Sequence, residues 1–216
     1  MSIPSSVLSK EAGIDRLARL GVTANDLRES LHAGYSYAAG CTGHDPRSLP
    51  GILAWGKGIG HLRDVMKTRG WTADSTSNYE TVVHPTNAHA IALASGTPET
   101  GRADGTPRTK TPKGPATSRV VKQNQQLSFA GADPAFGDAL VDDKDRETWV
   151  LLHYYDREAE EIRCELSCPS EMTGKQVTGW RDRIMLDPMP FSADLEIDVD
   201  GDDAGEIDID VSRRAD

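Results

Sequence analysis

The feature that most constrains the fold is a long polar segment in the middle of the chain. From residue 95 onward the sequence reads SGTPETGRADGTPRTKTPKGPATSRVVKQNQQ, with four prolines, four glycines and few large apolar side chains. Such a composition does not bury enough apolar surface to offset the conformational entropy lost on ordering. The sequence therefore predicts that residues 96–146, here called the central segment, form a linker with little fixed structure. A helix near residues 118–126 is the alternative for part of it.

Helices and one β-hairpin are expected before the central segment, in residues 1–95. Ser9 and Thr23 stand at positions suited to helix N-caps, and Pro50 suits the first turn of a third helix. In that third helix, apolar residues recur at helical spacing. The repeat continues through a GKGIGH motif, so close helix packing is preferred over a phosphate loop as the reason for its glycines. Residues 79–84 and 88–94 are predicted to pair as a hairpin.

The region after the central segment, residues 147–216, is rich in strand patterns. Strands are predicted at 148–156, 162–169 and 180–186, and residues 195–211 alternate apolar and acidic side chains around a GDDAG turn. The predicted fold class is α+β: N-terminal helices with a β-hairpin, a long Pro/Gly-rich basic linker, and a C-terminal antiparallel β-sheet. The expected parts are 1–95, 96–146 and 147–216. A sheet shared by residues 79–94 and the C-terminal strands is the alternative, and it would make one domain.

The hairpin predicted at residues 195–211 presents an acidic face. An EF-hand loop is excluded, because no register supplies all the oxygen ligands together with the final glutamate. Like charges that face one another across a hairpin destabilise it. This face is therefore expected to be a solvated edge, to bind a basic partner, or to bind a divalent metal with low affinity. Its six carboxylates belong to Glu196, Asp198, Asp200, Glu206, Asp208 and Asp210.

A short peptide at the end of the basic stretch is a candidate for partner binding. In KQNQQLSFAG, the residues Gln126, Leu127 and Phe129 resemble the peptide by which bacterial DNA-metabolism proteins dock on the sliding clamp. The resemblance implies that these three side chains enter an apolar pocket of the clamp. The sequence departs from that pattern at Ser128, where a leucine is usual. Packing of Leu127 and Phe129 onto a folded part is the alternative.

Charge is distributed unevenly along the chain, and one stretch is suited to nucleic acid. The formal net charge is −10, but residues 191–216 alone hold ten acidic and two basic residues. Residues 102–122 instead hold six basic residues and one acidic residue. Aromatic residues that would stack on bases are not interleaved there, so a solvated tether is the alternative. The candidate phosphate contacts are Arg108, Lys110, Lys113, Arg119 and Lys122.

Signatures of catalysis, cofactor binding and membrane insertion are not found in the sequence. The chain has no G-x-S-x-G, H-E-x-x-H or Walker motif, so an enzyme is less expected than a non-catalytic protein. Cys41, Cys164 and Cys168 lack a second pair of ligands, and neither a metal site nor a cofactor is predicted. Because no apolar run reaches the length of about 18 residues and the N-terminus lacks signal-peptide features, we expect a cytoplasmic protein without a membrane partner.

The order of several motifs resembles a family of uncharacterised proteins from bacterial genomes and mobile elements. These motifs are AGCTGHDPRSLPGILAW, RGW, IALASGTPETGRAD, PKGPAT, TWVLLHYYD and EIRCELS. The resemblance implies a bacterial or phage context and no particular activity. We expect a non-catalytic interaction protein that presents the linker peptide and the acidic β edge to protein partners, in DNA metabolism or host–element conflict. The alternatives are a metal-dependent enzyme that uses the C-terminal carboxylates, and a non-specific nucleic-acid binder that uses the basic linker.

Overall fold

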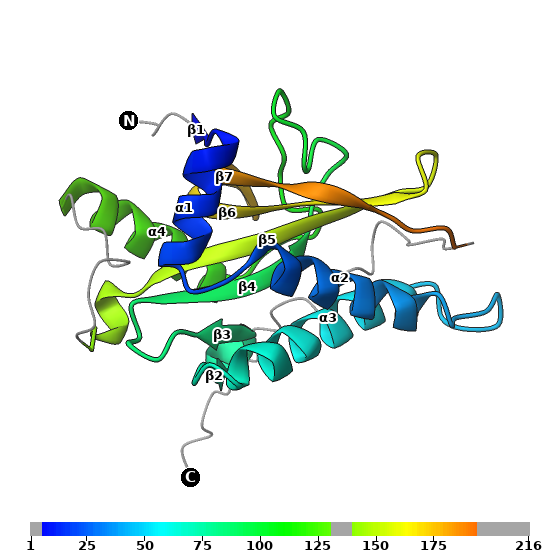
Figure 1. Cartoon of the computed structure of the whole chain (residues 1–216), viewed down its shortest axis with the longest axis horizontal. Helices are drawn as coiled ribbons and strands as arrows, with labels where there is room; N and C mark the ends of the chain where they lie inside the picture. Colours follow the sequence, from blue (N-terminus) through cyan, green and yellow to red (C-terminus); the bar gives the residue numbers. More distant parts are fainter. Residues whose placement is uncertain (1–5, 131–139, 194–216) are drawn as a thin grey trace, which may run out of the picture.

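The computed structural model describes residues 6–130 and 140–193, and within them four helices pack on one seven-stranded sheet (Figure 1). The fold is therefore mixed α/β. The helices are α1 (Lys10–Arg19), α2 (Ala24–Ala38), α3 (Leu49–Lys67) and α4 (Pro115–Ala130), with 3₁₀ turns at Thr76–Asn78 and Asp143–Asp145. The strands are β1 (Ser6–Val7), β2 (Thr72–Asp74), β3 (Thr81–Val83), β4 (His89–Ser95), β5 (Glu147–Asp156), β6 (Glu161–Thr173) and β7 (Gln176–Pro190).

One sheet contains strands from before and after the central segment. Its strand order is β1-β7-β6-β5-β4-β3-β2. β2, β3 and β4 pair antiparallel, β4 and β5 pair in parallel, and β5, β6 and β7 pair antiparallel. Because β4 precedes the central segment and β5 follows it, strands from both ends of the chain share one sheet. Alternating patterns identify strands singly but do not show which strands pair.

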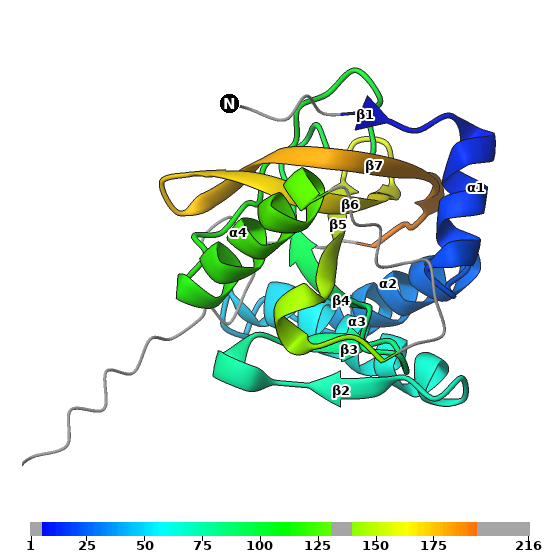
Figure 2. The ribbon, with the colours of Figure 1, turned by 90° about the vertical axis from the view of Figure 1, so that its left-hand side faces the viewer.

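Helices α1, α2 and α3 cover one face of the sheet, and α4 lies on the other (Figure 2). Glycine permits the close approach of α2 and α3, because a Cβ atom at Gly34 would lie 2.2 Å from the carbonyl oxygen of Ala54. Gly58 of the GKGIGH motif also lies at a packed position, where a Cβ would be 2.8 Å from the Leu93 side chain. The fully buried side chains of this face include Leu31, Leu62, Ile91, Trp149 and Leu166.

The first part of the central segment is a loop that β7 holds against the sheet. Arg183 forms a buried ion pair with Glu165, with 2.5 Å between its Nη2 and Oε2 atoms. The same guanidinium donates to the carbonyl oxygens of Gly105 and Arg102, at 2.6 and 3.0 Å. Trp180 donates its indole N–H to the Pro107 carbonyl oxygen at 2.8 Å. The loop is thus ordered by polar anchors rather than by its own apolar residues, which explains why its composition predicted little structure.

The second part of the central segment forms α4, which polar side chains attach to the sheet. β6 contains Pro169, which has no backbone N–H to donate. Asn124 of α4 enters the gap: its amide nitrogen donates to the carbonyl oxygens of Thr148 and Pro169, at 2.8 and 3.1 Å. Its side-chain oxygen accepts from the Thr148 N–H at 3.0 Å. A buried asparagine therefore replaces sheet hydrogen bonds that β6 does not make at this point.

Candidate anion-binding groove

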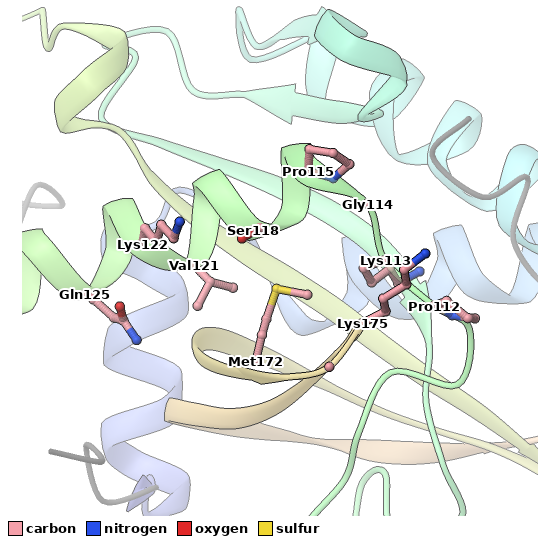
Figure 3. A pocket seen from close by; sticks show the side chains of 11 residues that line it. Pro112, Lys113, Gly114, Pro115, Ser118, Val121, Lys122, Gln125, Met172 and Lys175 are labelled. Carbon is pink, nitrogen blue, oxygen red and sulfur yellow. The ribbon is translucent and has the colours of Figure 1, made fainter. Parts of the chain in front are cut away.

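A groove of about 640 Å³ lies between α4 and the hairpin that joins β6 to β7 (Figure 3). The loop before α4 forms one end of it, and the side of α4 that carries Ser118, Val121 and Gln125 forms a wall. Met172 lies between the helix and the hairpin turn and supplies an apolar floor. Among the described residues that line the groove, none is acidic.

Three lysines from three different segments line this groove. Lys113 comes from the loop before α4, Lys122 from α4, and Lys175 from the β6–β7 turn. The loop and the turn are tied together, because the Lys113 N–H donates to the Lys175 carbonyl oxygen at 2.6 Å. The Lys113 ammonium also donates to the hydroxyl of Thr111 at 3.1 Å. Positions far apart in sequence thus place three positive charges around one depression.

The N-terminus of α4 opens at the same place and adds positive potential. Gly114 and Pro115, which precede and begin the helix, both line the groove. Proline suits this position, because the first-turn N–H groups have no partner within the helix. The helix dipole carries about half a positive charge at its N-terminus, and no acidic residue stands in the first turn of α4 to offset it. The lysines and the helix dipole therefore both attract an anion to the groove.

The positive charges of this region also contribute to the lowered pKa of a histidine inside the sheet. His153 of β5 is buried, and burial lowers its pKa to about 3, with smaller contributions from the charges of Lys110 and Lys113. Its Nδ1 atom lies 2.8 Å from the Tyr35 hydroxyl. The ring is therefore neutral in the folded protein at pH 7.

The structure brings only part of the predicted phosphate contacts together. Lys113 and Lys122 line the groove, whereas Arg119 points to the other side of α4 and donates to the Ser77 hydroxyl at 3.2 Å. Arg108 is exposed on the loop, and the backbone of Lys110 is bonded to the Ser95 carbonyl oxygen at 2.9 Å. Sequence reasoning missed Lys175. Its position in a TGK turn between two strands marks an exposed charge, but not its neighbours.

The predicted clamp-docking peptide forms the last part of α4 rather than an extended peptide. Leu127 is only 8% exposed, whereas Phe129 is 74% exposed and Gln126 also faces solvent. The three side chains do not point to one side, so entry into a single pocket requires this end of α4 to unwind. The glutamines before them already serve the fold, since Gln125 donates to the Ser170 carbonyl oxygen at 2.6 Å. The alternative, in which Leu127 and Phe129 both pack onto a folded part, matches the burial of Leu127 but not the exposure of Phe129.

The remaining predicted sites are the acidic face and the cysteines. The six carboxylates of the acidic face, at residues 196–210, lie outside the described residues. Within the described ranges, no group of three or more histidine, cysteine, aspartate or glutamate side chains is placed to bind a metal ion. Cys164 and Cys168 are buried thiols, and burial raises the pKa of Cys164 to about 12. Such thiols are unreactive at neutral pH.

Comparisons with known proteins find no match to this chain among family models, curated proteins or solved structures. The resemblance to uncharacterised bacterial proteins therefore stays a prediction. In the part of the chain that the structure describes, no helix combines the length and apolar character needed to cross a membrane. The function has to be inferred from the groove itself.

Proposed function

We propose that the protein binds nucleic acid without sequence preference, through backbone phosphates held in the groove along α4. The observation that supports this proposal is that Lys113, Lys122 and Lys175 line one groove along the first turns of α4, with no carboxylate in the lining. The chain carries a net charge of −10, but residues 191–216 account for most of it, and the rest of the chain is close to balanced. A local positive groove on such a protein concentrates binding at one place.

The shape of the groove favours a polymer over a small anion. Small phosphate sites enclose their ligand with backbone N–H groups and bidentate arginines. This groove instead offers lysines spread around an open volume of about 640 Å³. Lysine acts as a point charge without a fixed orientation, which suits a backbone whose phosphates vary in position. About three phosphate contacts give an affinity that falls about 20- to 40-fold between 50 and 200 mM salt.

The test is the salt dependence of oligonucleotide binding, measured by fluorescence anisotropy. A variant with Lys113, Lys122 and Lys175 all changed to Gln is compared with the unchanged protein. A matched control carries the same change at Lys10, Lys57 and Lys67, which lie on α1 and α3. The groove variant is expected to bind at least tenfold more weakly at 50 mM salt and to show a flatter salt dependence. Equal losses in the two variants, or no binding by the unchanged protein, would refute the proposal.

The expected role as a non-catalytic interaction protein stays a prediction beside this proposal. In the described part of the chain, the exposed aromatic side chain of Phe129 on α4 could contact a protein partner in such a role. The acidic face and the metal-dependent alternative both depend on residues 196–210, which the structure does not describe. The groove therefore carries the stronger argument.

A further inference from the structure

A narrow slot adjoins the groove and contains aromatic side chains. It has a volume of about 40 Å³, and its lining includes Trp55 of α3 and Tyr79, which precedes β3. Lys113 lines both the slot and the groove. Both residues are half-buried, so packing restrains each side chain while part of the residue faces solvent. Restrained, partly exposed rings next to a phosphate site are suited to stacking against a base.

A second cationic hollow, here called the outer hollow, lies beyond the slot. It has a volume of about 300 Å³, and Tyr79 lines both it and the slot. Arg119, a predicted phosphate contact that does not reach the groove, lines this hollow from the other side of α4. Groove, slot and outer hollow therefore adjoin one another through shared residues. Together they form a band around the first turns of α4, in which an aromatic part separates two cationic parts.

The acidic side chains along this band are paired with arginines. Glu80 lines the slot, and its carboxylate lies 2.7 Å from the guanidinium of Arg63. In the outer hollow, Asp74 and Asp143 lie 3.2 and 3.5 Å from the guanidinium of Arg146. Because one arginine serves both aspartates, the outer hollow owes its small positive excess to Arg119 and Lys144, which also line it.

We infer that the nucleic acid bound by the groove is single-stranded, and that its bases stack on Trp55 and Tyr79 where the backbone passes from Lys113 to Arg119. This inference rests on the proposed function. A single strand can bend around the end of α4 and turn its bases toward the protein, whereas a duplex keeps its bases paired and stacked inside. The slot is too small to admit a whole base, so stacking takes place at its mouth, on the exposed parts of the rings.

The inference also explains why the basic stretch contains no aromatic residues of its own. Proteins that bind single strands without sequence preference combine a positive track with aromatic platforms. Here the track comes largely from the central segment, whereas Trp55 comes from α3 and Tyr79 from the turn that precedes β3. The fold, rather than the local sequence, therefore brings the basic and the aromatic side chains together.

The test compares three probes of equal length: oligo-dT, an abasic oligonucleotide with the same phosphates, and a duplex. The unchanged protein is expected to bind oligo-dT about tenfold more tightly than the abasic strand, and more tightly than the duplex. Tyr79→Leu and Trp55→Leu are expected to reduce oligo-dT binding toward the abasic level and to leave abasic binding unchanged. Tyr37→Leu, at an exposed tyrosine of α2, is the matched control and is expected to alter neither.

The outcomes separate this inference from the proposed function. Equal, salt-dependent binding of oligo-dT, abasic strand and duplex would overturn the single-strand inference and leave the phosphate groove intact. A loss of abasic binding in the aromatic variants would also overturn it, because it would mean that the rings only support the fold of the groove. If none of the three probes binds in a salt-dependent way, the proposed function itself fails.

Discussion

Lowering the pH from 7 to 5 is expected to destabilise the folded protein through His153. This side chain is buried in β5, and its Nε2 atom has no hydrogen-bond partner within the described residues. Protonation would therefore charge a ring whose Nε2–H group has no acceptor in the core. Burial, together with the charges of Lys110 and Lys113, lowers the pKa of His153 from 6.5 to about 3.

The size of the effect follows from the difference between the folded and unfolded pKa values. Below pH 6.5 the unfolded chain binds a proton at His153 that the folded chain does not bind. Stability is therefore complete above pH 6.5 and is lost as the pH falls toward 3. With these two pKa values, the loss contributed by this one group is about 2 kcal/mol at pH 5.

The assay is urea denaturation at pH 7 and pH 5, for the unchanged protein and for His153→Gln. Glutamine keeps an acceptor for the Tyr35 hydroxyl but does not titrate. The variant is less stable at pH 7, but its free energy of unfolding should fall between the two pH values by about 2 kcal/mol less than that of the unchanged protein. His84, whose pKa burial also lowers, contributes equally to both proteins. An identical pH dependence in the two proteins would refute the reasoning.

Two further predictions concern the helix contact and the loop anchor. Gly34→Ala should destabilise the protein by about 1–3 kcal/mol in urea denaturation, because the added Cβ would overlap the facing helix. Gly56→Ala is the control and should be neutral or stabilising, because a Cβ there meets nothing within 4 Å. Equal effects of the two substitutions on the free energy of unfolding would contradict the packing argument. Arg183→Met should cost about 3–5 kcal/mol, because Glu165 is left buried and unpaired. The Arg183→Met substitution should also make the loop sensitive to trypsin at Arg102. An unchanged rate of cleavage there would contradict the role of Arg183 in holding the loop.

Local patterns were informative where the structure depends on neighbours in sequence. Thr23 and Asp26 form the capping box at the start of α2, with reciprocal hydrogen bonds of 2.8 and 3.1 Å. Ser9 caps α1 by accepting from the Ala12 N–H at 3.3 Å. Such contacts span three residues and are visible in the sequence. The order of the central segment depends instead on Arg183 and Trp180, more than seventy residues away, and no local rule reveals them.

The candidate site was predictable to the same limited extent. Lys113 and Lys122 stand out because basic residues cluster around them in the sequence. Lys175 does not stand out, since it is a single charge in a turn. Trp55 was assigned to an amphipathic helix from its spacing alone, and that spacing does not show that the end of its side chain reaches a slot beside α4. The site residues that the sequence did not reveal are those that segments other than the central segment contribute.

Irregularities in the pairing of β6 and β7 lie shortly before the turn that carries Lys175. The register between β6 and β7 shifts near Ile162, Pro169 and Glu171, and such bulges bend a strand. Beyond these shifts the hairpin turns its apolar side toward α4, where Val177 and Trp180 join a small core with Val121 of the helix. Pro169, beside which Asn124 supplies hydrogen bonds to β5, stands at one of these shifts, so the irregular part of β6 and the turn with Lys175 both lie against α4.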